Sequence, residues 1–298
     1  MTTVVRRLPG PFATRTCTAS DGTFAWHEDR STGLTGLLSP RQLAALADVV
    51  PRVPCAAIVP AVADRVVTWA PVPTQRLAFD VVFGPSAPPD RALNTFQCLG
   101  GYLGALHRVR LPVELVELPT YHDDRIRPAD ARLAAARAAA RARLAEVLSA
   151  DAVERRPVPA PVLTHGRFST GVIALGSRPV VLGWREAGPG SPDLDVDTLL
   201  SELAEAAAVV PGRAGWATAA AVAFAGGYRR TSPAMPAVTA ARLAERLLDR
   251  AVDHLALRAA VTGDDSAPVA LLRLVRARLA EFCAPVAARL SEARTEES

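Results

Sequence analysis

The sequence predicts an α+β protein in which a small antiparallel sheet precedes a mainly helical region. Short strand-like segments lie in the first 73 residues, where Ser20-Asp21-Gly22 is a strong hairpin signal because Asp-Gly tolerates the positive φ of a tight turn. Long helical patterns dominate after residue 90. We therefore expect an N-terminal lobe of residues 1–73 and a helical C-terminal lobe of residues 74–298.

The N-terminal lobe should contain a few strands and one helix. The hairpin signal predicts strands at about 12–20 and 23–28, and two more are expected around Ile58 and at 65–69. Ser39-Pro40 combines an N-cap with a first-turn proline, so a helix should run from there to about Val50.

The C-terminal lobe carries helical patterns on both sides of a hairpin. Phe96 and the leucines that follow it recur at helical spacing, which predicts a helix from Asp90 to about Arg108. An Ala- and Arg-rich pattern predicts a second helix at about 130–148. A hairpin is expected at 161–195, and helices from Asp195 onward.

Composition limits the classes of function. No run approaches the roughly 18 strongly apolar residues of a membrane span, and no export signal follows the N-terminal arginines, so we expect a cytoplasmic protein. The four cysteines are scattered, which favours buried thiols over a zinc site. The net charge of +4 is spread over the chain, so we expect no nucleic-acid partner. All 34 basic residues are arginine, a bias typical of GC-rich genomes such as those of actinomycetes.

One stretch carries the most specific pattern. Leu106-His107 ends the first predicted helix of the C-terminal lobe, and Gly227-Tyr228 lies among the later helices. Between them the order of residues is His165-Gly166-Arg167, then Val172, then Gly183-Trp184-Arg185-Glu186, then Asp193-Leu194-Asp195.

This order resembles the aminoglycoside phosphotransferase and choline kinase superfamily. Its catalytic loop reads His-Gly-Asp with Asn five residues later, and a metal-binding Asp precedes a Trp. The resemblance implies a two-lobed, protein-kinase-like fold, with Pro71-Val72-Pro73 as the hinge. It also implies that Asp195 hydrogen-bonds back to the catalytic loop and that His165 supports the loop backbone.

The groups that perform phosphoryl transfer in this superfamily are replaced here. Arg167 stands at the catalytic Asp, and a guanidinium cannot accept a proton. Val172 and Gly183 stand at the metal-binding Asn and Asp, and neither side chain offers Mg²⁺ an oxygen. The superfamily's phosphate-binding lysine is absent, and we expect His27 on the second strand to take its position.

These departures favour a pseudokinase with no catalytic residue and no cofactor. The resemblance implies a subunit that binds a precursor peptide or a partner enzyme, because degenerate members occur in class V lanthipeptide and thioamitide pathways for ribosomal peptides. Arg167, Arg185 and His27 are candidate binding residues for an acidic group of such a peptide. The sequence does not predict an oligomeric state.

Two alternatives remain open from the sequence. The chain could be an atypical ATP-dependent phosphotransferase, acting on a peptide hydroxyl or a small molecule, in which Glu186, Asp193 or Asp123-Asp124 replace the lost acids. The arginines could also be neutralised within the protein, with Arg167 paired to Asp195 and Arg185 exposed to solvent.

Overall fold

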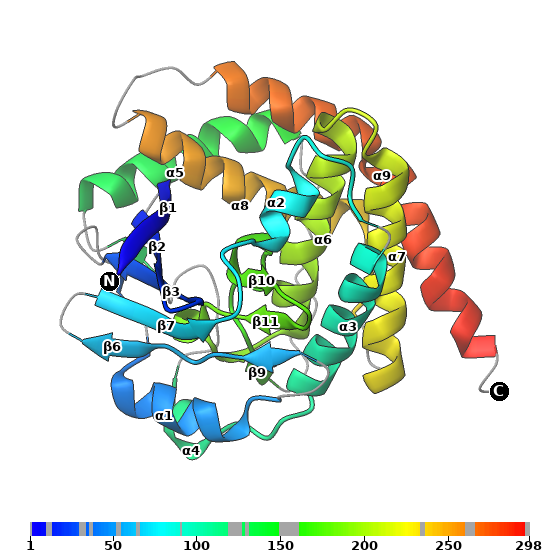
Figure 1. Ribbon diagram of the computed structural model, residues 1–298. Coiled ribbons are helices and arrows are strands. Elements are labelled where there is room, and N and C mark those ends of the chain that lie inside the picture. Colours follow the sequence, from blue (N-terminus) through cyan, green and yellow to red (C-terminus); the bar gives the residue numbers. More distant parts are fainter. Residues whose placement is uncertain are drawn as a thin grey trace.

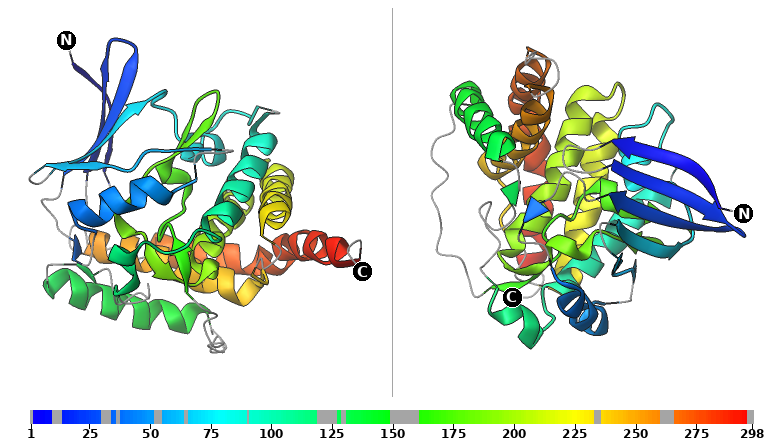
Figure 2. Two further views of the ribbon diagram at one scale, coloured as in Figure 1. Left: turned by 90° about the horizontal axis from the view of Figure 1, so that it is seen from below. Right: turned by 90° about the vertical axis from the view of Figure 1, so that its left-hand side faces the viewer.

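The computed structural model places a strand-rich part at one end of the molecule and helices over the rest (Figures 1 and 2). It describes residues 2–9, 14–29, 34–35, 38–51, 55–63, 66–89, 91–118, 127–128, 131–148, 161–232, 236–259 and 266–295. The predicted α+β class is confirmed. Within these residues, no helix is both long and apolar enough to cross a membrane.

The main sheet has five antiparallel strands in the order β1-β2-β3-β7-β6. The predicted hairpin is confirmed between β2 and β3, where Asp21 and Gly22 have φ values of 50° and 77°. The edge strand β1 was not predicted from the sequence. The strands are β1 (Thr3–Pro9), β2 (Thr14–Ser20), β3 (Thr23–Asp29), β6 (Ala61–Ala63) and β7 (Val66–Val72).

Helix α1 (Pro40–Val49) begins where Ser39 was expected to cap it. The Ser39 side chain accepts a hydrogen bond from the Gln42 backbone N–H, and the Gln42 side chain accepts one from the Ser39 backbone N–H. This reciprocal capping satisfies two backbone donors at the start of the helix. Leu43 and Leu46 bury the apolar face of α1 in the main core.

A hairpin in the C-terminal part carries the motif stretch. The strand nearest Ile58 is β5. It does not join the main sheet but pairs in parallel with β11 of this hairpin. One short strand of the first 73 residues is thus built into the C-terminal part. The remaining strands are β4 (Leu34–Thr35) paired with β8 (Arg127–Pro128), β5 (Ala56–Ala57), β9 (Val162–Thr164), β10 (Ile173–Leu175), β11 (Pro179–Val181) and β12 (Gly188–Gly190).

Helices form the rest of the C-terminal part. The two helices expected after the hinge correspond to α3 and α5, although Asp90, the expected start of the first, lies outside the described residues. The helices are α2 (Ala78–Val82), α3 (Arg91–Leu106), α4 (Val113–Val116), α5 (Ala131–Leu148), α6 (Pro192–Val209), α7 (Ala214–Thr231), α8 (Ala240–Ala259) and α9 (Ser266–Thr295).

Two apolar clusters hold the molecule together. The larger one fills the helical part, and the smaller one joins the main sheet to the hairpin. This second cluster lies where the sheet meets the motif stretch, so it positions the candidate site. Its buried members are Cys17, Trp26, Val67, Trp69, Val72, Leu77, Val172, Ala174, Val180 and Leu182.

Candidate functional site

The buried carboxylate of Asp195 holds the backbone of the loop after β9. Asp195, in the first turn of α6, accepts hydrogen bonds from the backbone N–H groups of His165 at 2.7 Å and Gly166 at 2.9 Å. The carboxylate is fully buried. The structure therefore places Asp195 where the resemblance expects it, on the backbone of the degenerate catalytic loop.

Two further residues extend this support. The His107 ring donates from Nε2 to Asp195 Oδ2 at 3.2 Å, and its Nδ1 accepts from the Tyr228 hydroxyl at 2.7 Å. All three side chains are buried. From the sequence alone, His107 had no assigned function beyond its place at the end of a predicted helix. The signal was nevertheless present, because Leu106-His107 and Gly227-Tyr228 are two of the segments that carry the resemblance.

The ring of His165 bridges parts of the loop backbone. Its Nε2 donates to the Leu182 carbonyl at 2.6 Å, and its Nδ1 accepts from the Arg167 N–H at 3.3 Å. Burial lowers the pKa of His165, although Asp195 and the Leu182 carbonyl act in the opposite direction. Both ring nitrogens are occupied in holding the loop.

The two positions that the resemblance assigns to metal ligands, Val172 and Gly183, lie against each other. Gly183 has a φ of 88°, and a Cβ built on it would lie 2.8 Å from Val172 Cγ1. Val172 is 2% exposed and belongs to the second apolar cluster. An apolar side chain therefore fills the space that would lie between two oxygen ligands, and these residues do not fit Mg²⁺.

Arg167, at the position of the catalytic acid, pairs with a neighbour in the motif. Its Nη1 lies 3.3 Å from Glu186 Oε1, and its side chain is 37% exposed. The expected internal partner, Asp195, is instead committed to the loop backbone. Glu186, one of the acids proposed to replace the missing catalytic groups, is therefore the ion-pair partner of Arg167.

Arg185 is buried and reaches across to the main sheet. Its Nη1 forms an ion pair with Oε1 of Glu28 on β3. Oε2 of the same carboxylate accepts from Arg15 Nε at 2.9 Å, and Arg15 Nη1 donates to the Gly171 carbonyl at 3.0 Å. The expectation that Arg185 is solvent-exposed when the arginines pair internally is wrong, because its side chain is only 7% exposed.

His27 does not face these arginines. Side chains alternate along a strand, so Glu28 and Trp26 point to one face of β3 and His27 points to the other. The His27 ring is hydrogen-bonded to Thr18 Oγ1 at 2.9 Å and Thr68 Oγ1 at 3.0 Å. Glu28, which sequence reasoning missed, is the residue of this strand that reaches the motif stretch.

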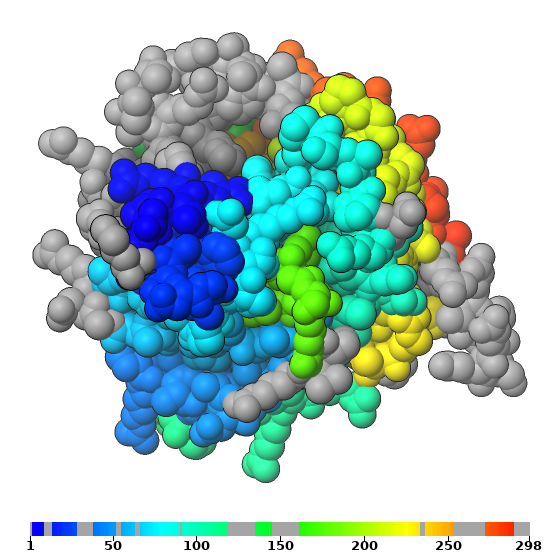
Figure 3. Space-filling view, viewed as in Figure 1, coloured from blue at the N-terminus to red at the C-terminus, as the bar shows by residue number. Residues whose placement is uncertain are grey.

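The face of the sheet that carries Glu28 also carries two packed tryptophans and a further ion pair. Trp26 and Trp69 are cross-strand neighbours, each 2% exposed, in the cluster that includes Val172. Arg6 on β1 binds both oxygens of Asp80 on α2, at 2.5 Å each. In Figure 3 the blue N-terminal strands accordingly lie against the cyan segment that includes α2.

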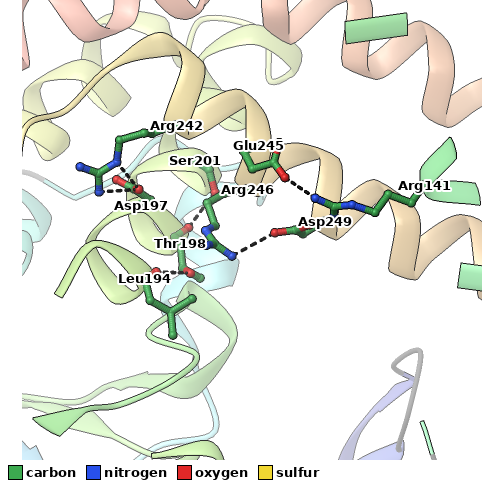
Figure 4. A network of polar contacts seen from close by, with 9 residues as sticks. All are labelled: Arg141, Leu194, Asp197, Thr198, Ser201, Arg242, Glu245, Arg246 and Asp249. Atoms are coloured by element: carbon green, nitrogen blue, oxygen red, sulfur yellow. Dashed lines mark hydrogen bonds and ion pairs between the residues drawn. The ribbon is translucent and has the colours of Figure 1, made fainter. Parts of the chain in front are cut away.

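Two of the acids at the start of α6 share one arginine, whereas Asp195 accepts from the loop backbone. Arg242 of α8 contacts Asp193 at 3.1 Å and Asp197 at 2.7 Å. Figure 4 shows the pair of Arg242 with Asp197, together with ion pairs that join α8 to Arg141 of α5. Burial raises the pKa of Asp197 to about 6, although Arg242 opposes the shift. Asp123-Asp124 lie outside the described residues. Among the described residues, no group of three or more His, Cys, Asp or Glu side chains could hold a metal ion.

Solved structures of phosphotransferases share this architecture. A spectinomycin phosphotransferase, in complex with ADP and spectinomycin, superposes with a TM-score of 0.55 at 12% identity, over 98% of this chain and 93% of its own. An aminoglycoside phosphotransferase mutant with ADP and hygromycin B gives 0.52 at 14% identity, over 95% of each chain. A choline/ethanolamine kinase family protein from Mesorhizobium loti gives 0.50 at 12% identity, over 96% and 92%.

These likenesses establish the fold. The chain has the two-lobed fold of the aminoglycoside phosphotransferase and choline kinase superfamily, as the motif stretch implied. No protein-family model and no curated protein matches the sequence.

Proposed function

We propose that the chain is a pseudokinase, which keeps the phosphotransferase fold as a binding module and does not transfer phosphate from ATP. The observation that carries this proposal is the contact between Val172 and Gly183. Phosphoryl transfer in this fold depends on metal ions that bridge the phosphates and neutralise charge. An apolar contact where two oxygen ligands would meet leaves the reaction without that neutralisation.

The position of the catalytic base supports the same proposal. A guanidinium at residue 167 cannot accept the proton of a substrate hydroxyl. Glu186 and Asp193, two acids that could have been relocated into the reaction, are paired with Arg167 and Arg242 respectively. Each of these two carboxylates therefore already has an arginine of the chain as its partner.

For the binding partner we propose a precursor peptide or a partner enzyme of a ribosomal-peptide pathway in the cytoplasm. This follows from the resemblance to degenerate superfamily members in lanthipeptide and thioamitide pathways. The counter-charges of Arg167 and Arg185 come from within the chain, so the partner surface need not involve an acidic group at these arginines. A chain that keeps the fold but lacks the metal-binding and catalytic-base side chains is suited to binding a partner.

Isothermal titration calorimetry with ATP and Mg²⁺ tests the first half of the proposal. We expect no saturable heat in the micromolar range, and no transfer of radiolabel from ATP to the chain or to added peptide. Magnesium-dependent micromolar binding of ATP would show that the contact between Val172 and Gly183 does not block the metal site. Labelling of a peptide hydroxyl would instead establish the atypical phosphotransferase.

The second half predicts that a gene for a short precursor peptide lies beside the gene for this chain, and it is tested with that peptide. Fluorescence anisotropy should show saturable binding of the labelled peptide, with the same apparent Kd in the presence and absence of ATP and Mg²⁺. A peptide of the same composition in scrambled order is the control. Equal binding of the scrambled and native peptides would refute specific recognition.

A further inference from the structure

The charges that face each other between the sheet and the motif stretch are opposite to those of a working phosphotransferase. In protein kinases a lysine on the third strand binds the nucleotide phosphates, and acidic and amide side chains below it hold the metal ions. In this chain the third strand presents the carboxylate of Glu28, and Arg185 lies below it. The two sides therefore attract each other directly, without a nucleotide between them.

The Glu28 carboxylate has the partners that an anionic ligand would have. Arg15 donates to one oxygen at 2.9 Å, and Arg185 pairs with the other. The side chains of Glu28 and Arg185 are 11% and 7% exposed. Burial alone would raise the pKa of Glu28, but Arg15 and Arg185, with a smaller contribution from Arg167, outweigh it and lower the pKa. The carboxylate is therefore charged at neutral pH.

We propose that Glu28 is a built-in anion that occupies an arginine site between the lobes, and that this site accepts an oligophosphate when Glu28 is removed. Guanidinium groups bind carboxylate and phosphate oxygens with the same paired geometry. Buried arginines that lose their carboxylate are left with an uncompensated charge, which favours the entry of another anion. The inference rests on the proposed function, because it assigns the space between the lobes to the protein's own side chain.

An anion that belongs to the chain has an advantage over a free one. Glu28 is held by β3 between Arg15 and Arg185, so its effective concentration at the site exceeds that of a dissolved ligand. The same ion pairs fix β2 and β3 onto the loop that contains Gly171. The wild-type chain should therefore keep its lobes together and exclude phosphate without any nucleotide.

The test is a calorimetric titration with inorganic tripolyphosphate in the absence of magnesium. Glu28→Ala should bind tripolyphosphate with an apparent Kd at least about tenfold lower than the wild type. Glu117→Ala, which removes an exposed carboxylate and changes the net charge equally, should behave as the wild type. Equal affinity in the Glu28→Ala variant and the wild type would overturn the proposal.

A second variant locates the gained binding. Glu28→Ala combined with Arg15→Gln removes one of the two donors, so the gain in affinity should be lost. Retained binding would place the anion elsewhere on this basic chain and would contradict the proposal. Glu28→Gln provides a smaller perturbation in case Glu28→Ala does not fold, and it should also bind tripolyphosphate more tightly than the wild type.

Hydrogen exchange of the wild-type protein gives a readout that needs no variant. Millimolar tripolyphosphate should leave the exchange of amides in β2, β3 and residues 165–172 unchanged, because Glu28 occupies the site. Added protection in these segments would overturn the proposal. Failure of the proposed function has a different signature, which is magnesium-dependent binding or turnover of ATP by the wild type.

Discussion

The two sides of the degenerate catalytic loop differ in what they retain. Behind the loop, Asp195, His107 and Tyr228 form a buried network in which each hydrogen bond supports the backbone or the next side chain. On the side that faces the sheet, Val172 and Gly183 form an apolar contact at the positions that the resemblance assigns to metal ligands.

This difference separates the requirements of the fold from those of the reaction. Buried backbone N–H groups need acceptors whether or not the protein is an enzyme, so the carboxylate of Asp195 remains necessary. A metal-binding side chain has no such structural function, so an apolar residue in its place would leave no backbone group unpaired. The predictions below test whether the loop depends on its rear support more than on the side that faces the sheet.

The largest effect is expected for Asp195→Asn. The Asp195 carboxylate accepts hydrogen bonds from three N–H donors. In asparagine an NH₂ group replaces one carboxylate oxygen, so at least one of these buried donors would be left unpaired. The free energy of unfolding should fall by about 2–4 kcal/mol, because each unsatisfied buried donor costs about 1–3 kcal/mol. Urea denaturation monitored by circular dichroism measures this change.

Asp193→Asn is the matched control for that variant. Asp193 lies on the same helical turn, but its side chain is 41% exposed and contacts only the edge of the network through Arg242. Its substitution should cost less than about 1 kcal/mol. Similar losses in both variants would mean that the effect comes from the helix terminus, and the distinction between the two sides of the loop would fail.

Gly183→Ala tests the side that faces the sheet and should have a smaller effect. A Cβ at a φ of 88° is strained, and it would lie 2.8 Å from Val172 Cγ1. We expect a loss of about 1–2 kcal/mol in the free energy of unfolding. Gly215→Ala on α7, where nothing lies within 4 Å of the added methyl group, should instead be neutral or stabilising by about 0.5–1 kcal/mol. A neutral Gly183→Ala would mean that the loop can move to accept a side chain.

Local signals in the sequence predicted the parts of the fold that depend on a few neighbouring residues. The Asp21-Gly22 turn and the Ser39 cap were recognisable because their geometry is set within four residues. The edge strand β1 was missed because Val4-Val5-Arg6-Arg7 lacks a clean alternation, and the register shift between Val4 and Arg6 disturbs the pattern further.

Motif order brought the correct loop residues together, but not the carboxylates that neutralise the arginines. Glu28 is 157 residues from Arg185, and its position opposite Arg185 depends on how the sheet packs against the hairpin. The strand's own alternation favours Glu28, because Phe24 and Trp26 share its face, but the expectation for His27 followed the position of the superfamily's lysine instead. A shift of the strand register by one residue would exchange the faces of His27 and Glu28. The burial of Trp26 and Trp69 fixes that register.

The last prediction concerns how the contribution of His165 to stability depends on pH. The pKa of His165 is lowered from 6.5 by burial, so its ring stays neutral in the folded state at pH values where the unfolded chain is protonated. Stability should therefore fall as pH decreases through 6.5, by up to about 1.4 kcal/mol per pH unit until the folded pKa is reached.

A difference measurement isolates this contribution from that of Asp197. The raised pKa of Asp197, about 6, makes the folded state bind its proton first, so Asp197 stabilises the fold as pH falls and opposes the effect of His165. His165→Gln keeps a donor for the Leu182 carbonyl but cannot titrate. The free energy of unfolding of the wild type minus that of His165→Gln should decrease between about pH 7.5 and about pH 5.5. A difference that does not change with pH would show that His165 binds its proton equally in the folded and unfolded states, so that burial does not keep the ring neutral.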